Sequence, residues 1–240
     1  MVVLQAIADD PGKLDIARLT KLLPYPRGTL YRIVTALLAE GLISESRGTY
    51  QLGHRLIHLA SKSWETSDLR SAARDFIEAL RNATGETVHL AVPSGTGMVY
   101  IDKLESPRTV RMTSRIGTRV ELYSTSVGKA YLAALPEAQL RTVLASLDLR
   151  PRTDNTVTEI EALEAEICRT RERGYSYDNE ENEPDIKCFG GAILDRSGMP
   201  VGGVSLSIPI YRYDEDCHRE YARRVRETVA AISAGLADIV

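Results

Sequence analysis

The stretch 26–41 constrains the fold of this chain most, because it carries the complete pattern of one short amphipathic helix. Pro26 suits the first helical turn, and Gly41 suits the position just past the helix end. The pattern therefore predicts a helix with one buried face and one polar face. The apolar residues follow the i, i+3, i+4, i+7, i+8 spacing of a buried stripe: Leu30, Ile33, Val34, Leu37 and Leu38.

The polar face of this helix carries arginines, a phenol and hydroxyls near the helix start. Such groups contact the phosphates and base edges of DNA, although an ordinary surface helix can present the same face to solvent. The residues that we expect to meet DNA are Arg27, Gly28, Thr29, Tyr31, Arg32 and Thr35.

The flanking segments favour DNA binding over an ordinary surface helix. Upstream, the segment 14–23 has the pattern of a short helix, which Pro24-Tyr25-Pro26 ends. Downstream, the segments 42–45 and 49–52 alternate like two strands, with Arg47 in the turn between them. Helix, tight turn and second helix form the helix-turn-helix layout, and a hairpin directly after it is a wing. Residues 1–53 are therefore predicted to form a winged helix-turn-helix DNA-binding domain.

The remaining chain is long enough for a second domain, since the sequence has 240 residues. A helical pattern at 54–67 is predicted to link the first domain to an effector-binding and oligomerisation domain at 68–240. Strand-like runs and amphipathic helices do not alternate regularly there, which predicts an α+β fold with an antiparallel sheet flanked by helices. The expected strands are 86–92, 97–104, 108–114, 174–178, 187–194 and 200–208, and the expected helices are 68–84, one that follows 124–130, 136–147, 159–173 and 214–240.

Charge, cysteine content and hydropathy narrow the class of protein. The net charge is −3, divided into +2 for residues 1–60 and −5 for the rest, so positive charge gathers weakly around the predicted DNA-binding face. The three cysteines are odd in number and far apart, which favours neither a disulfide framework nor a metal site. No run approaches the ~18 apolar residues of a membrane helix, and no leader pattern is present. We expect a cytoplasmic protein without a membrane, metal or cofactor partner.

The signatures of common enzymes are incomplete in this sequence. Gly128-Lys129 lacks the opening glycine and the closing Ser/Thr of a phosphate loop, and the stretch 203–207 lacks the second glycine of a nucleophile elbow. His89 stands alone in an apolar strand, as a core histidine does. No catalytic residue is predicted. One enzymatic alternative stays open, in which a small acid is processed through Cys188 with Asp178 or His89, because a catalytic cysteine needs a base within reach.

Five motifs together resemble the IclR-type bacterial transcriptional regulators, over essentially the whole chain. The resemblance implies a winged helix joined by a helix to an effector-binding domain similar to GAF folds. It also implies homodimers, often paired into homotetramers, on palindromic double-stranded operator DNA. The motifs are Gly28-Thr29-Leu30-Tyr31-Arg32, Gly48-Thr49-Tyr50-Gln51-Leu52-Gly53, Thr84-Gly85-Glu86-Thr87-Val88-His89-Leu90-Ala91, Gly128-Lys129-Ala130 and Arg173-Gly174-Tyr175-Ser176-Tyr177-Asp178.

The resemblance further implies an effector site. Two serines at i and i+2 on a strand point the same way and can bind one polar group. The backbone N–H groups at the start of a helix favour a carboxylate, and the helix start expected here includes Gly128. The serines could instead face solvent, and the cysteine could be a small buried apolar group. The matching positions are Asp178, Cys188, Ser205 and Ser207 for the polar site, Ser126 and Val127 for an anion-facing loop, and Met112 and Val120 for an apolar wall.

The sequence thus predicts a DNA-binding transcriptional regulator that is switched by a small-molecule effector, an organic acid or sugar acid. It leaves open the identity of the effector, the operator sequence, and the choice between repression and activation.

Overall fold

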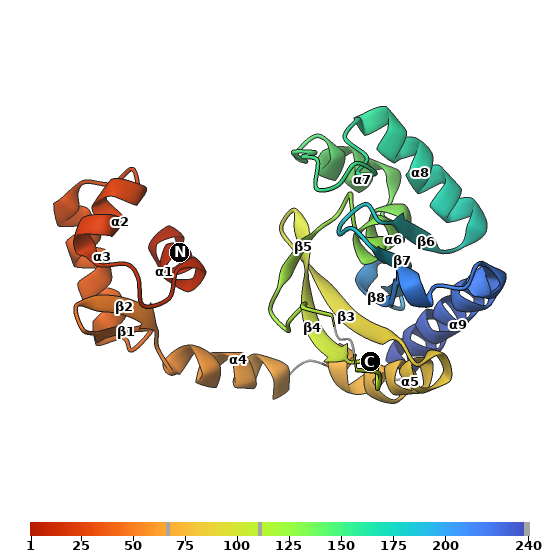
Figure 1. Cartoon of the computed structure of the whole chain (residues 1–240), viewed down its shortest axis with the longest axis horizontal. Coiled ribbons are helices and arrows are strands. Elements are labelled where there is room, and N and C mark those ends of the chain that lie inside the picture. The colour runs from red at the N-terminus through yellow and green to blue at the C-terminus, as the bar shows by residue number, and fades with distance from the viewer. Residues whose placement is uncertain (66–67, 110–111, 238–240) are drawn as a thin grey trace. The chain divides into compact units, whose positions relative to one another are not determined.

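The computed structural model describes residues 1–65, 68–109 and 112–237 of the chain (Figure 1). The chain divides into two compact units, Met1–Ser67 and Asp68–Val240. The boundary falls at the end of the segment 54–67 that was expected to link two domains, and residues 66–67 of that segment lie outside the described residues. The functions assigned to the two segments stay predictions at this point.

The first unit packs its first three helices against a two-stranded hairpin, and a fourth helix follows the hairpin. Its core contains Leu30 and Val34 from the apolar stripe of the sequence. The hairpin turn consists of Arg47 and Gly48, which both have positive φ (53° and 78°), as the two-residue turns that match strand twist require. The elements are α1 (Val2–Asp9), α2 (Ile16–Leu22), α3 (Arg27–Ala39), β1 (Ile43–Ser46), β2 (Thr49–Leu52) and α4 (Arg55–Glu65).

The second unit is built on a six-stranded antiparallel sheet with helices on both sides (Figure 1). The strand order is β5-β4-β3-β8-β7-β6 among the described residues. The strands are β3 (Thr87–Ser94), β4 (Gly97–Leu104), β5 (Arg119–Glu121), β6 (Ser176–Asn179), β7 (Ile186–Leu194) and β8 (Pro200–Pro209). The helices are α5 (Asp68–Thr84), α6 (Ser126–Ala134), α7 (Glu137–Leu144), α8 (Ile160–Arg173) and α9 (His218–Ala237), with the short 3-10 turns η1 (Ile210–Arg212) and η2 (Glu215–Cys217).

The two faces of the sheet differ in chemistry because side chains alternate along each strand. On β8, the apolar residues Val204, Leu206 and Ile208 belong to the core that packs against α5 and α9. The residues between them, Ser205 and Ser207, are 2% exposed and lie on the opposite face. That second face receives α6, and beside α6 it holds a polar cavity.

Several elements differ from the sequence prediction. Strand β5 was not predicted, and α6 begins at Ser126, inside the segment 124–130 that it was expected to follow. The described part of 108–114 is not a strand. Lys103 Nζ donates hydrogen bonds to the carbonyl oxygens of Met112 and Ser114 at 2.8 and 2.7 Å, and β5 occupies the edge position on β4. Residues 110–111 lie outside the described residues. The last helix begins at His218 rather than at 214, because η2 precedes it, and residues 238–240 also lie outside the described part.

Candidate functional site

The polar face of α3 is exposed, as its sequence predicts. Arg27, Gly28, Tyr31, Arg32 and Thr35 are exposed, whereas Thr29 is half-buried. Tyr31 is 63% exposed, so its ring and hydroxyl are accessible to a partner.

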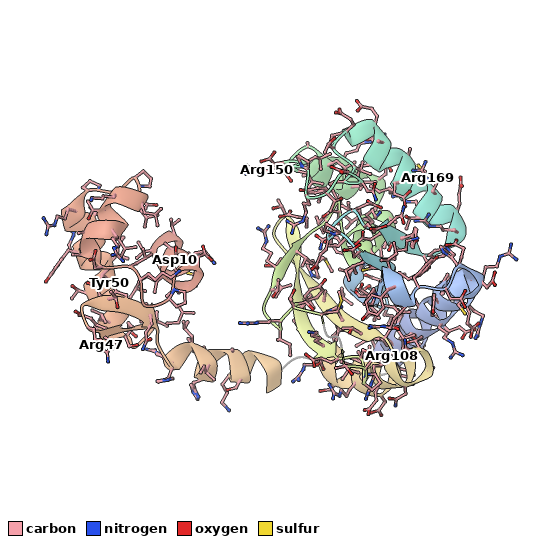
Figure 2. The ribbon with its side chains drawn as sticks, viewed as in Figure 1. Asp10, Arg47, Tyr50, Arg108, Arg150 and Arg169 are labelled. Atoms are coloured by element: carbon pink, nitrogen blue, oxygen red, sulfur yellow. The ribbon has the colours of Figure 1, made fainter. Side chains whose placement is uncertain are left out.

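Arg47 lies at the turn between β1 and β2 and is exposed (Figure 2). Within the described ranges, Arg27, Arg32 and Arg47 form no ion pair with a carboxylate. The unit therefore presents three guanidinium groups that are free to bind phosphate or base edges.

A cavity of about 280 Å³ opens on the polar face of the sheet in the second unit. Strands β3 to β8 and the start of α6 all contribute to its wall. Seven of the nine predicted effector residues line it: Met112, Val120, Ser126, Asp178, Cys188, Ser205 and Ser207. Whether they bind an effector stays a prediction, but the fold brings them together.

The two other predicted residues do not line the cavity. Val127 is fully buried in the core formed with α7 and α8. The N–H of Gly128 donates to Thr125 Oγ1 at 3.1 Å, in the helix N-cap, so this amide is already satisfied. The sequence pointed to the correct helix start, but only Ser126 of the three residues reaches the cavity wall.

A chain of hydrogen bonds runs along the cavity wall from α6 to β3. Ser126 Oγ lies 2.9 Å from Ser205 Oγ, which lies 3.5 Å from Ser207 Oγ. Ser207 Oγ is also 3.5 Å from His89 Nδ1, and the Nε2 of the same ring is 2.8 Å from Ser114 Oγ. Hydroxyls can donate or accept, so this chain can reorient to meet either kind of ligand group.

The sequence missed several residues of the cavity wall. His89 is buried and hydrogen-bonded, as expected of a core histidine, but it also pairs across the sheet with Ser205 and so shares the polar face. A detectable signal was its place between Val88 and Leu90, both fully buried on the other face. The loop residues carried no such periodic signal. The missed wall residues are His89, Tyr100, Thr113, Ser114, Arg115, Thr118, Arg119, Glu121, Thr125, Arg152, Asn182, Glu183 and Ile186.

Burial controls the protonation of the polar groups in this wall. It lowers the pKa of His89 to about 3, with a further lowering by the Lys103 charge, so the ring is neutral. Burial raises the pKa of the Cys188 thiol well above its ordinary value, and the nearby Asp178 carboxylate raises it further. Burial also raises the pKa of Asp178 to about 7, although the Lys129 charge opposes this.

These shifts argue against Cys188 as a nucleophile. Its Sγ donates to Ser207 Oγ at 3.2 Å, and the imidazole of His89 is reached only through that hydroxyl. A reactive cysteine needs a lowered pKa and a base within hydrogen-bond reach. The pKa of this thiol is raised instead, the nearby Asp178 carboxylate contributes to that rise, and the thiol donates to a hydroxyl.

The described part of the chain holds no cluster of three or more side chains suited to a metal ion. No helix within the described ranges is long and apolar enough to cross a membrane.

A family model described as bacterial transcriptional regulator IclR, C-terminal, matches residues 61–234. This chain belongs to the IclR family. The HTH-type transcriptional regulator KdgR of Escherichia coli (strain K12) is 31% identical over 234 residues, which cover 97% of this chain and 89% of KdgR. Thermotoga maritima IclR, a crystal structure, is 35% identical with a TM-score of 0.75, and the match covers 98% of this chain and 96% of that one.

A third match shares the fold. It is the crystal structure of an IclR homolog from Microbacterium hydrocarbonoxydans in complex with 4-hydroxybenzoate, 22% identical with a TM-score of 0.79, over 99% of this chain and 97% of that one. As an IclR-family protein this chain is a transcriptional regulator and not an enzyme, so the alternative of a small-acid-processing enzyme is wrong.

Proposed function

We propose that this IclR-family regulator binds operator DNA through a winged helix-turn-helix at 1–53 and binds a small organic acid in the cavity of its second unit. The observation that carries the proposal is the cavity itself, a polar pocket on a buried sheet face in a family of transcriptional regulators. The effector acts by binding two conformations of the protein with different affinity, which is the only way that it can change DNA affinity.

The DNA-binding part rests on the exposed face of α3 and on the hairpin after it. A helix that follows a tight turn after α2 has the position of a recognition helix, with its first residues toward the base edges. Arg32 and Tyr31 stand one helical turn above Arg27 and Gly28 on this face. Arg47 in the wing reaches the phosphate backbone or a neighbouring groove.

The test of this part is operator binding by an Arg32→Ala variant. DNA is selected from random sequence by the wild-type protein and then used at fixed salt concentration. A guanidinium that reads a base contributes about 1–3 kcal/mol, so binding should weaken roughly 5- to 150-fold, with relaxed preference at one base position. Arg219→Ala, which removes the same charge from an exposed position on α9, is the matched control. Equal affinity of Arg32→Ala and wild type, or a failure to select any DNA, would contradict the proposal.

The effector part rests on the division of charge within the cavity. Arg115, Arg119 and Arg152 line it with exposed guanidinium groups, and the hydroxyls of Ser126 and Ser205 lie inside. These groups suit the carboxylate and hydroxyl oxygens of a small acid. The volume of about 280 Å³ lies near the lower limit for ligand pockets, which favours a compact acid.

The test of the effector part is a thermal-shift screen with 4-hydroxybenzoate, gluconate and lactate, followed by calorimetry on the acid that binds. The double variant Ser205→Ala/Ser207→Ala should bind that acid more weakly by about tenfold or more, because each lost hydrogen bond costs about 1 kcal/mol of binding free energy. Ser197→Ala, at an exposed turn between β7 and β8, is the control. Unchanged affinity in the double variant would place the ligand elsewhere.

We also propose that the protein acts as a homodimer, with pairing into a homotetramer as the larger form. The first unit exposes apolar side chains on and beside α4, with Ile57 67%, Leu59 48% and Leu52 41% exposed. A second copy of the chain would cover this surface, and the two winged helix-turn-helix domains of the dimer would double the contacts with a palindromic operator. A mass of one chain by light scattering, both free and on DNA, would refute this.

A further inference from the structure

We propose that Asp178 takes up a proton when the cavity binds its anionic effector, and that the protonated carboxyl then donates a hydrogen bond to the effector. The inference rests on the proposed effector function and adds how this site recognises an acid. It makes Asp178 a specificity-determining residue, because it requires a hydrogen-bond acceptor on the part of the effector that faces it.

The position of Asp178 leaves part of its carboxyl available to a ligand. The residue lies on β6, is 3% exposed and lines the cavity. Its Oδ1 accepts from the backbone N–H groups of Glu181 at 2.7 Å and Asn182 at 3.3 Å. Both hydrogen bonds use the same oxygen, so Oδ2 is the oxygen that can meet an effector.

The nearest buried cation is already neutralised by another carboxylate. Lys129 on α6 is fully buried, and its Nζ lies 2.6 Å from Glu181 Oε1. Glu166 on α8 stands 4.0 Å from the same Nζ but pairs with Arg169 and Arg173 on its own helix. Lys129 and Glu181 thus cancel, and the charge of an ionised Asp178 is left in excess.

One carboxylate oxygen of Glu181 has no hydrogen-bond donor within the described ranges, which agrees with a shortage of positive charge in this cluster. Its Oε2 is buried and has no hydrogen-bond partner among the described residues. The buried cluster therefore contains more carboxylate oxygens than its single ammonium group can satisfy.

The other groups around Asp178 do not supply the missing charge. Cys188 on β7 and Tyr100 on β4 stay neutral, because burial and the Asp178 charge raise the pKa of both. Ser207 on β8 and Ser126 on α6 carry no charge. Glu183, in the loop between β6 and β7, adds an exposed negative charge. Arg152 is also exposed, and its Nε donates to the carbonyl oxygen of Asn182 at 3.2 Å.

An anionic effector that enters the cavity would come close to the negative charge of an ionised Asp178. Burial raises the pKa of Asp178 to about 7, so near neutral pH the carboxyl is divided between its two forms. The negative charge of a bound effector disfavours the ionised form of Asp178 further, so Asp178 takes up a proton. The protonated carboxyl on β6 is then a donor, while Arg119 on β5, at the opposite edge of the sheet, and Arg115 just before β5 hold the carboxylate of the effector.

The consequence is a pH dependence of effector affinity with a defined sign. The protonated form is the one that binds, so affinity is constant well below the pKa of about 7 and falls above it. Between pH 6 and pH 8 the dissociation constant should rise about tenfold, with uptake of up to one proton for each acid bound. Asp178→Asn donates at every pH, so it should bind with little pH dependence. Asp178→Ala should bind weakly throughout.

The experiment is calorimetry of wild type, Asp178→Asn and Asp185→Asn with 4-hydroxybenzoate, gluconate and lactate at pH 6 and 8, in buffers of different ionisation enthalpy. Asp185 is an exposed carboxylate of the following turn, and asparagine tolerates its φ of 63°, so this control removes the same charge without strain. Proton uptake in wild type and in Asp185→Asn, but not in Asp178→Asn, supports the inference.

A second measurement follows the carboxyl of Asp178 itself by carbon NMR with labelled aspartate. A resonance that is absent from Asp178→Asn should titrate near pH 7 in the free protein and at higher pH with acid bound. Binding of an acid without proton uptake overturns the inference alone. If no acid binds wild type at either pH, the proposed effector function is overturned, whatever the titration of Asp178.

Discussion

Replacing Gly190 by alanine should destabilise the second unit by about 3 kcal/mol, because helix α6 lies directly against the backbone of β7 at this residue. A Cβ built on Gly190 would meet the carbonyl carbon and oxygen of Ser126, each at 2.5 Å, and the hydroxyl of Ser176. Ordinary contacts of a Cβ lie at 3.4–4 Å. The start of α6 would therefore have to move away from the sheet by about an ångström.

The magnitude follows from which atoms clash. Two of the three are backbone atoms of Ser126, so no rotation of a side chain relieves the contact. Overpacking of a well-packed core costs about 1–3 kcal/mol, and a clash with backbone belongs at the upper end. For a unit of this size each kcal/mol lowers the melting temperature by about 2–4 °C, so we expect a loss of about 6–12 °C.

Gly235 offers a control with the opposite sign. It lies within α9, and a Cβ built on it would meet nothing within 4 Å. Alanine in a helix interior is more favourable than glycine by about 0.5–1 kcal/mol, so Gly235→Ala should raise the melting temperature by roughly 1–4 °C.

The assay is differential scanning calorimetry of both variants beside wild type at one pH and protein concentration. The result that refutes the reasoning is a Gly190→Ala melting temperature within 1 °C of wild type, because the close approach of α6 to β7 would then be wrong. The same approach positions Ser126 at the cavity, so Gly190→Ala should also weaken binding of whichever acid the screen returns.

Two further predictions concern protonation and access in the cavity wall. Burial lowers the pKa of His89 to about 3, so protonation favours the unfolded chain, and wild-type stability should fall as pH drops from 6.5 toward 3. His89→Gln should flatten that part of the stability curve measured by urea unfolding, whereas an unchanged slope would contradict a buried neutral imidazole. The thiol of Cys168 is exposed and that of Cys188 is buried, so iodoacetamide should modify Cys168 in the native protein and Cys188 only after unfolding. Mass spectrometry of peptides reads this out, and fast native labelling of Cys188 would overturn its assigned burial.

The parts of the fold that follow a simple period were predictable from the sequence. The stripe in 26–41 predicted a helix, and α3 spans Arg27–Ala39 with Leu30 and Val34 buried. The prediction of an antiparallel sheet flanked by helices is confirmed, because alternation and helix capping are local properties that tertiary packing did not override here. Ser205 and Ser207 reach one face of β8 for the same reason.

The parts that depend on single long-range contacts were not predictable. The segment 108–114 alternates like a strand, but Lys103 binds the carbonyl oxygens of Met112 and Ser114 that a neighbouring strand would have used. The arginines of the cavity lie in polar loops, where composition alone does not distinguish a wall residue from a solvated one. The buried Lys129 entered the sequence analysis as part of an incomplete phosphate loop and of a family motif, but its pairing with Glu181 across 52 residues has no local signature.

The cavity is a feature of the whole sheet face rather than of a few separate residues. One face of β3, β7 and β8 buries Leu90, Phe189 and Leu206 completely, and the other face carries His89, Cys188 and serines. Polar groups placed on a buried face cost free energy unless hydrogen bonds satisfy them. In the hydroxyl chain Ser205 and His89 each have one short hydrogen bond, whereas Ser207 Oγ lies 3.5 Å from both Ser205 Oγ and His89 Nδ1. Oxygen atoms of a ligand would replace these weak contacts with stronger hydrogen bonds. The buried polar face, which costs free energy in folding, therefore favours the binding of a ligand.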